Sequence, residues 1–392
     1  MADVSTRIRE LAELFRAPAE FFVRSQELKE RFGTEACDFR AGDPHELATD
    51  RYVETLRRGA EPTGPDHFAY TQTLPSAAEA VAGSLRRETG LEYGERDVTM
   101  TNGAIAGIAV TVAAICDPHD EVIIVSPPHF LYEPLVRTQG ARAVRVPMDR
   151  KTFDLDLGAI ERALSPRTRA IIVNSPHNPT GRIYPRPVLD GLAELLTAAS
   201  ERSGRTVYLL SDEAYRRVLF DGRSFHPPAV SYRNTLTIYT YGKTLLAPGM
   251  RLGYVAAHPG IEDRLGLIDA IESAQLLLGW AFPNVDLQHV LPELEEISVD
   301  VSALQRRRDR MVEALRSMGY ETHVPEATFY LVVRSPVPDD QAFTAMLGEE
   351  GVLVMPGRLL EMPGTIRLSL TASDGMVERS LAVFERVRKQ VA

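Results

Sequence analysis

The chain has 392 residues, of which 44% are apolar and 25% charged, as is typical of a soluble globular protein too long for one hydrophobic core. Its 44 basic and 54 acidic residues leave a formal charge of −10, and no basic run interrupts that balance. Two domains are therefore predicted, and nucleic acid is excluded as a partner.

The start of the chain lacks the features of a targeting signal. Residues 5–15 are amphipathic and mixed in charge, and no apolar run approaches membrane-spanning length. Cys37 and Cys116 are too few for a disulfide framework, and no Cys/His cluster has the spacing of zinc ligands. We expect a cytoplasmic protein with no membrane partner and no bound metal.

Residues 75–280 alternate short β-branched runs with longer helical patterns, which indicates a parallel sheet covered by helices. Ligands of such sheets collect at the carboxyl ends of the strands, where polar or glycine-rich segments follow each run. The runs predicted as buried strands are residues 121–125, 170–173, 206–210 and 236–240.

The pattern changes beyond residue 285. A charged helix is predicted over residues 301–318, another helix near 340–350, and strands over 328–333, 352–354 and 365–368. We therefore predict a large domain, residues 46–285, and a small α+β domain, residues 286–392, with which the N-terminal segment, residues 1–45, packs.

Lys243 is the most informative of only four lysines. It lies in the apolar, glycine-rich segment 238–254, where its pKa should fall and its neutral amine should attack carbonyls, as a Schiff-base lysine does. Lys29, Lys151 and Lys389 lie among charged or turn residues and are expected at the surface.

Polar residues at other strand ends fit a bound pyridine ring. Asp212 follows an apolar strand, and its buried carboxylate needs a cationic partner, which a protonated ring nitrogen would supply. Tyr215 and Asn178 could both reach the phenolic oxygen of that ring. Each residue alone could equally be a cap or turn residue.

A phosphate on the same ring would need fixed donors. Arg251, eight residues after Lys243, offers a guanidinium fork, and Thr240 offers a hydroxyl. The predicted helix start at Gly103, Ala104 and Ile105 adds free backbone N–H groups, although many helices begin after a glycine.

Together these motifs resemble the class I/II aminotransferases, the aspartate aminotransferase-like enzymes of pyridoxal-phosphate fold type I. The resemblance rests on Asn178-Pro-Thr-Gly181, Asp212-Glu-Ala-Tyr215 and the run 240–254, and it covers nearly the whole chain. It implies an α/β fold in which helices sandwich a mostly parallel seven-stranded sheet, beside a smaller α+β domain. It also implies pyridoxal 5′-phosphate as cofactor and a homodimer with active sites at the interface.

The resemblance assigns roles to individual residues. Lys243 would hold the cofactor and act as general acid and base, with Asp212 and Tyr215 as further catalytic residues. Gly42 and Arg367 match the positions that bind the substrate α-carboxylate, with Asn178 assisting. Either Phe68 or Tyr70 would reach the phosphate of the neighbouring subunit.

The chain departs from the family pattern at His129 and Ile105. His129 stands where an aromatic ring usually stacks on the pyridine, so it is either a smaller stacking plate or an additional acid/base. Ile105 replaces a polar side chain, which leaves only its backbone N–H for the phosphate. Trp280, beside Phe282, would form an apolar substrate wall or dimer core, and Arg358 is a candidate for binding a second substrate carboxylate.

The leading hypothesis is an aminotransferase that moves an amino group between an L-amino acid and a 2-oxo acid by a ping-pong route. A lyase, synthase, cyclase or oxidase acting on an amino acid on the same scaffold is the alternative. A ligand-sensing transcription regulator is disfavoured, because no basic helix-turn-helix precedes the first predicted strand near residue 38.

Overall fold

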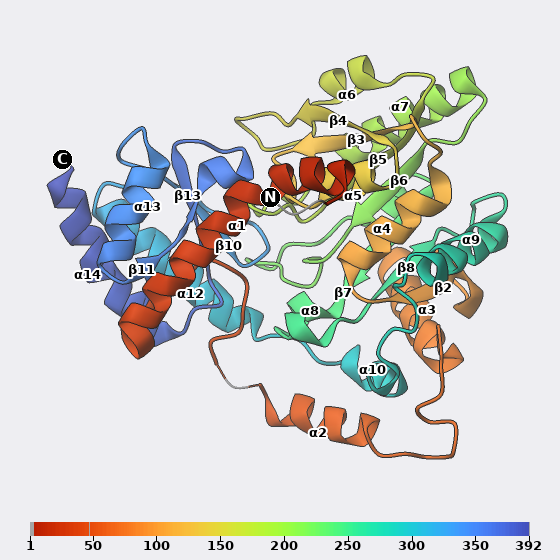
Figure 1. The fold of residues 1–392 in the computed structure, drawn as a ribbon, viewed down its shortest axis with the longest axis horizontal. Coiled ribbons are helices and arrows are strands. Elements are labelled where there is room, and N and C mark those ends of the chain that lie inside the picture. The colour runs from red at the N-terminus through yellow and green to blue at the C-terminus, as the bar shows by residue number, and fades with distance from the viewer. Residues whose placement is uncertain (1–3, 47, 392) are drawn as a thin grey trace.

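The computed structural model describes residues 4–46 and 48–391. Its centre is a seven-stranded sheet in the order β2-β8-β7-β6-β5-β3-β4 (Figure 1). All neighbouring strands are parallel except β8, which runs antiparallel to β2 and β7. The predicted mostly parallel sheet is confirmed. Its strands are β2 (Val98–Thr101), β3 (Glu121–Ser126), β4 (Arg142–Pro147), β5 (Thr168–Asn174), β6 (Tyr208–Asp212), β7 (Thr235–Thr240) and β8 (Gly253–Ala257).

Helices cover both faces of this sheet because successive apolar side chains of its strands point to opposite sides. Ile124 packs with the helices of one face and its neighbour Ile123 with those of the other. The first face carries α4 (Ala104–Ile115), α5 (Tyr132–Thr138) and α9 (Arg264–Leu277), and the second carries α6 (Leu157–Ala163) and α7 (Arg186–Ser203).

One central strand ends later than the sequence indicates. The strand expected over residues 206–210 begins at Tyr208 and continues to Asp212, because Asp212 still pairs with Asn174 of β5 and Ile238 of β7. Asp212 is therefore the last residue of the strand and not the first residue after it. The carboxyl ends of β5, β6 and β7 lie side by side.

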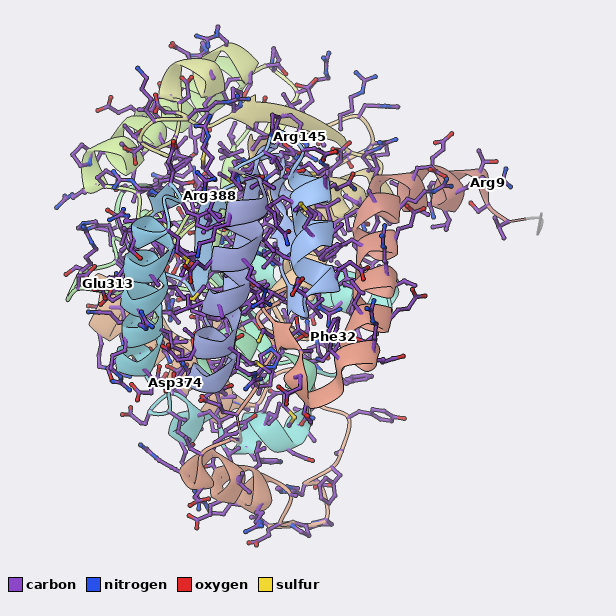
Figure 2. All side chains as sticks on the ribbon, turned by 90° about the vertical axis from the view of Figure 1, so that its left-hand side faces the viewer. Arg9, Phe32, Arg145, Glu313, Asp374 and Arg388 are labelled. Carbon is purple, nitrogen blue, oxygen red and sulfur yellow. The ribbon has the colours of Figure 1, made fainter. Side chains whose placement is uncertain are left out.

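The C-terminal residues form a second sheet, in the order β12-β13-β10-β9. Its strands are β9 (Thr322–His323), β10 (Tyr330–Arg334), β12 (Met355–Pro356) and β13 (Thr365–Ser369). Three helices pack beside it: α12 (Val301–Ser317), α13 (Asp340–Glu349) and α14 (Asp374–Gln390). Figure 2 shows them in a row that α1 (Thr6–Phe32) extends.

The N-terminal segment joins this second part of the molecule. Strand β1 (Cys37–Asp38) pairs in parallel with β11 (Val352–Leu353), while α1 reaches across to α5, where the rings of Phe15 and Phe130 lie 5.4 Å apart. The exact domain boundaries stay a prediction. The remaining helices are α2 (Asp50–Gly59), α3 (Pro75–Thr89), α8 (Tyr241–Thr244), α10 (Val285–His289) and α11 (Leu291–Leu294). In residues 4–46 and 48–391, no helix has the length and apolar character needed to cross a membrane.

Candidate active site

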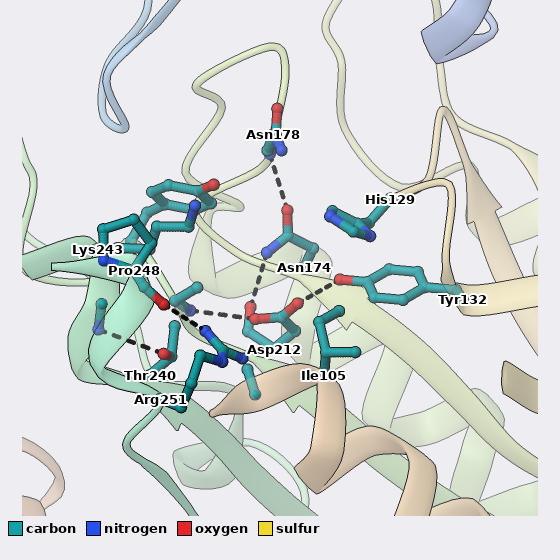
Figure 3. A pocket seen from close by; sticks show the side chains of 14 residues that line it. Ile105, His129, Tyr132, Asn174, Asn178, Asp212, Thr240, Lys243, Pro248 and Arg251 are labelled. Atoms are coloured by element: carbon teal, nitrogen blue, oxygen red, sulfur yellow. Dashed lines mark hydrogen bonds between the residues drawn. The ribbon is translucent and has the colours of Figure 1, made fainter. Parts of the chain in front are cut away.

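A pocket opens at the carboxyl ends of β5, β6 and β7 (Figure 3). It has an empty volume of about 600 Å³, part of which is open to solvent. Most residues expected at the cofactor line it, together with several that the sequence did not single out. The lining residues are Ala104, Ile105, His129, Tyr132, Asn174, Asn178, Asp212, Ala214, Tyr215, Thr240, Gly242, Lys243, Pro248 and Arg251.

Lys243 reaches the pocket from α8, a single helical turn that follows β7 directly. Thr240 caps this turn, since its hydroxyl accepts a hydrogen bond from the Gly242 N–H at 3.3 Å. The Lys243 Nζ atom lies 5.9 Å from the ring centre of Tyr215 and 5.8 Å from that of Phe329. The amine is thus placed between the strand ends and the second sheet.

Asp212 has neutral hydrogen-bond donors inside the protein. Its Oδ2 accepts a short hydrogen bond from the Tyr132 hydroxyl, and its Oδ1 accepts one from the Ala214 N–H at 3.2 Å. Burial raises the pKa of Asp212, while these two bonds and the charge of Lys243 counteract the rise. The carboxylate therefore has hydrogen-bond partners within the protein, whereas the sequence had suggested only a protonated ring nitrogen as its partner.

Sequence reasoning missed Tyr132 and Asn174. Tyr132 lies three residues after His129, at the first turn of α5, where it can face the same space. Asn174 ends β5, donates from Nδ2 to the Asp212 carbonyl at 2.9 Å, and accepts from the Asn178 N–H at 2.8 Å. Its position at the end of an apolar strand was the available signal.

Tyr215 packs edge-on against two aromatic residues of the second sheet region. Its ring centre lies 5.3 Å from that of Phe329 and 5.9 Å from that of Tyr330. Burial, and then Tyr330, raise the pKa of Tyr215 well above its ordinary value. Burial also acts to raise the pKa of Tyr330, but the charges of Lys243 and Arg367 outweigh it and lower that pKa below 10. Tyr330 is a further neighbour that the sequence did not single out.

Arg251 and the start of α4 form a donor-rich corner. Arg251 has a left-handed backbone, with φ of 52°, and its guanidinium donates to the carbonyls of Pro248 at 2.7 Å and Asn102 at 3.0 Å. Gly103 has a φ of 87°, which favours glycine, and a Cβ atom there would come within 2.5 Å of the Arg251 Nη2. The free N–H groups of the first turn of α4 adjoin this arginine, which suits an anion.

Arg367 lies next to the pocket, on β13, and contacts Asn178 from there. It donates to the Asn178 Oδ1 at 3.2 Å and to the Arg40 carbonyl at 2.8 Å, and its guanidinium carbon lies 4.0 Å from the ring centre of Tyr330. Its Nε is buried and has no hydrogen-bond partner within residues 4–46 and 48–391. The arginine therefore retains a donor for a further ligand.

Gly42 lies close to the same group of residues. A Cβ atom there would come within 2.3 Å of the Phe329 ring and 3.0 Å of the Tyr330 hydroxyl. A larger residue would displace the aromatic rings that border Lys243 and Arg367. Gly42 itself is not part of the pocket lining.

His129 lines the pocket as a neutral imidazole. Burial, and then the charges of Lys243 and Arg367, lower its pKa to about 3. Its Nδ1 accepts a hydrogen bond from the Leu131 N–H at 3.3 Å, and its ring centre lies 4.4 Å from that of Phe130. This setting favours a stacking surface over a proton donor at neutral pH.

Phe68, Tyr70 and Trp280 do not line the pocket of their own chain. Tyr70 is 88% exposed, and its ring lies 4.9 Å from that of Phe282. The Trp280 carbonyl accepts a hydrogen bond from the Asn102 side chain at 2.6 Å, which connects this exposed region to the Arg251 corner.

Arg358 is also held away from the pocket. Its guanidinium is paired with Asp339 at 2.7 Å and with Asp340. It is therefore not a free cation for a second substrate carboxylate, contrary to the suggestion from the sequence.

The side chains of the pocket fit pyridoxal phosphate. An amine, a buried carboxylate and two phenols surround a space beside His129, and an arginine with a glycine-led helix start lies at one end. No group of three or more Asp, Glu, His or Cys residues that could hold a metal ion occurs in the part of the chain that the structure describes.

Comparison with known proteins gives consistent results. The model of the family "Aminotransferase class I and II" matches residues 35–384. The aspartate/prephenate aminotransferase of Thermus thermophilus is 32% identical over 366 residues, covering 91% of this chain and 92% of that protein. A probable N-succinyldiaminopimelate aminotransferase of Mycobacterium tuberculosis is 32% identical over 71% of this chain and 70% of its own.

Solved structures are also similar over nearly the whole chain. An aminotransferase from Eubacterium rectale superposes with a TM-score of 0.91 at 29% identity, covering 100% of this chain and 99% of its own. The aspartate aminotransferase of Thermus thermophilus with maleate gives a TM-score of 0.83 at 29% identity, covering 99% of this chain and 100% of its own.

Proposed function

Because this chain belongs to the class I and II aminotransferases, and is a pyridoxal-phosphate-dependent enzyme that transfers amino groups, we propose that Lys243 is its catalytic lysine. The observation that carries the proposal is that Lys243, Asp212 and Arg251 line one pocket. Bound pyridoxal phosphate supplies an electron-withdrawing ring that stabilises negative charge on a substrate carbon. Lys243 Nζ takes the proton from the substrate Cα and later returns one.

Three residues orient the ring in this proposal. Asp212 pairs with the ring nitrogen and keeps its proton in place, supported from behind by the Tyr132 hydroxyl. Tyr215 and Asn178 hold the phenolic oxygen, and the Asn178 backbone is itself fixed by Asn174. The high pKa of Tyr215 keeps its hydroxyl protonated and able to donate. His129 supplies a neutral surface for the face of the ring.

The phosphate is assigned to the corner that Arg251 forms with the start of α4. Arg251 provides charge, Thr240 provides a hydroxyl, and Gly103, Ala104 and Ile105 provide backbone N–H groups at the start of α4. The contact that a Cβ on Gly103 would make with Arg251 supports this assignment, since it shows how closely the backbone and the guanidinium approach each other.

The substrate α-carboxylate is assigned to Arg367, with Asn178 and the backbone near Gly42. The buried Nε of Arg367, which has no partner within the described residues, supports this assignment because a buried donor without an acceptor is costly. A carboxylate bound there would leave the substrate amine free to face Lys243. Two half-reactions at this site exchange an L-amino acid for a 2-oxo acid.

We also propose a homodimer, located in the cytoplasm. Several apolar side chains are exposed in the single chain, and covering them in a dimer would remove them from water; they are Phe68, Tyr70, Leu277, Trp280 and Phe282. In such a dimer Phe68 or Tyr70 would approach the phosphate of the other subunit, and Trp280 would contribute to the substrate wall. The free thiols of Cys37 and Cys116 suit a reducing compartment.

The test is reconstitution with pyridoxal phosphate followed by Lys243→Ala. The wild-type protein should acquire a visible absorbance band, which an amino-acid donor removes and a 2-oxo acid restores. Lys243→Ala should remain folded and lose turnover by on the order of 10²–10⁴-fold, because its proton acceptor is gone. Lys151→Ala, at an exposed turn, serves as control. Normal turnover in Lys243→Ala, or ammonia release without any acceptor in the wild type, would contradict the proposal.

A further inference from the structure

A cluster of buried charges lies behind the pocket and takes no part in the roles assigned above. The ionic cluster consists of Glu88, Glu213, Arg216, Arg217 and Glu295. The side chains of Glu213 and Arg216 are 1% exposed and that of Glu295 is 3% exposed. None of the five lines the pocket. Burying so many charges is costly, which suggests a purpose beyond stability.

The segment 212–217, which begins at the last residue of β6, divides its side chains between the pocket and the cluster. Asp212 and Tyr215 line the pocket, while Arg216 pairs with Glu213 at 3.2 Å and Arg217 pairs with Glu295. Arg217 also donates to the Glu295 carbonyl at 3.3 Å. The ionic cluster thus contacts the side of this segment that faces away from the pocket, and Asp212 lies on the side that faces it.

The helical turn α8 is divided in the same way. Lys243 lines the pocket, while Tyr241, two residues earlier, donates a short hydrogen bond from its hydroxyl to Glu295 Oε1. Glu295 therefore accepts from Arg217 through one oxygen and from Tyr241 through the other. A buried bridge, Arg217–Glu295–Tyr241, links the segment carrying Asp212 to the turn carrying Lys243.

This bridge matters because α8 has only four residues. A single helical turn has little stability of its own, so tertiary contacts must set its orientation. The Thr240 cap and the hydrogen bond between the Tyr239 and Thr244 hydroxyls hold its ends. The hydrogen bond from Tyr241 to Glu295 fixes α8 relative to the ion pair that Glu295 forms with Arg217.

Resting on the function proposed above, we propose that Arg217, Glu295 and Tyr241 are positioning residues that set the place of the Lys243 amine relative to Asp212. They act through α8 and touch neither coenzyme nor substrate. Loss of the bridge leaves the pocket residues present while letting the amine shift, and small displacements of a reacting group slow its reaction strongly.

Tyr241→Phe tests this proposal with minimal change in volume. Tyr320→Phe is the matched control, because the Tyr320 hydroxyl is also buried and donates to the Phe384 carbonyl at 2.9 Å, within the second part of the molecule. For each variant, three quantities are measured: the thermal midpoint, the pH midpoint of the visible absorbance of the coenzyme-loaded protein without substrate, and the single-turnover rate with an amino-acid donor.

Both variants should lower the thermal midpoint, Tyr241→Phe by more, because its hydroxyl donates to a carboxylate whereas that of Tyr320 donates to a backbone carbonyl. Only Tyr241→Phe should move the pH midpoint of the absorbance and slow the single turnover, by on the order of tenfold. Glu295→Gln, which keeps the shape of the side chain, should move both quantities in the same direction.

If Tyr241→Phe matches Tyr320→Phe in absorbance midpoint and rate, the bridge is purely structural and the proposal is wrong. A wild-type protein that shows no visible band with pyridoxal phosphate would instead overturn the function proposed for Lys243. The two failures are therefore distinguishable.

Discussion

At the scale of single residues, the environment of Asp212 decides how the pocket works. An aspartate at a strand end could be recognised from the sequence, but the donors that hold its two oxygens come from Tyr132 and Ala214. Tyr132 is 80 residues away in the chain, and only the packing of α5 against β3 and β4 of the same sheet brings its hydroxyl there. Burial and hydrogen bonding then compete to set the protonation of the carboxyl.

Tyr132→Phe should shift the acidic limb of the pH–rate profile to higher pH. The Tyr132 hydroxyl lowers the pKa of Asp212 by donating to its carboxylate, so loss of this hydroxyl raises that pKa. Fewer molecules then carry the ionised carboxylate, and the single-turnover rate falls most at low pH. The rate is measured from pH 5 to 9.

Tyr232→Phe is the control for this experiment, because its buried hydroxyl donates to the Val207 carbonyl at 2.6 Å, on the opposite face of the sheet. Superimposable profiles for wild type and Tyr132→Phe would show that the hydroxyl does not influence Asp212.

At the scale of elements, the long apolar strands could be predicted and the short turns that carry chemistry could not. Residues 122–125 and 170–173 are apolar throughout, and both runs lie in strands of the structure. Helix α8 is too short to leave a periodic pattern, and its conformation depends on contacts with β7, β8 and Glu295. The buried Arg217–Glu295 pair behind it left no sequence signal either, since its partners lie 78 residues apart in the chain.

Glu213, in this buried cluster, should make the unfolding free energy of the protein depend on pH. Burial raises the pKa of Glu213 to about 7, although Arg216 and Ser211 counteract the rise, whereas the unfolded carboxyl titrates near 4.5. Between these values the folded state retains a proton that the unfolded state releases. The contribution of Glu213 to the unfolding free energy is therefore greatest below about pH 4.5 and falls as pH rises to about 7.

Glu213→Gln should flatten the loss of stability across this pH range, because the amide does not titrate. Between pH 5 and 7.5 the unfolding free energy of the wild type should fall by on the order of 2–3 kcal/mol more than that of the variant, as measured by denaturant unfolding. Glu378→Gln, at an exposed ion pair with Arg310, serves as control. An unchanged slope in Glu213→Gln would mean that this carboxyl titrates elsewhere.

At the scale of the whole molecule, both ends of the chain build the second part of the protein. β1 pairs with β11 across more than 300 residues of sequence, and α1 lies beside α13 while also reaching α5. The Arg40 carbonyl that accepts from Arg367 belongs to the N-terminal segment, so this arrangement also shapes the pocket. The association of two whole molecules is the other property at this scale, and the exposed apolar residues are assigned to its interface.

Leu277→Glu should weaken self-association. Leu277 is 86% exposed in the single chain, and a carboxylate at an apolar interface would be desolvated without a partner. The dissociation constant of the dimer, measured by analytical ultracentrifugation, should rise on the order of 100-fold or more. Activity should fall in parallel if the partner subunit completes the site. Val23→Glu, on the exposed side of α1, is the control. An unchanged sedimentation coefficient in Leu277→Glu would place the interface elsewhere.

The sequence by itself determined the alternation of strands and helices, the predicted Schiff-base lysine and the polar residues at the strand ends, because these depend on local periodicity and on motifs within a few residues. Only the tertiary structure decided that Tyr132 holds Asp212, that Asp339 and Asp340 hold Arg358, and that Glu295 joins Arg217 to Tyr241. Such pairings depend on distances between atoms of remote segments, which exist only once the chain has packed.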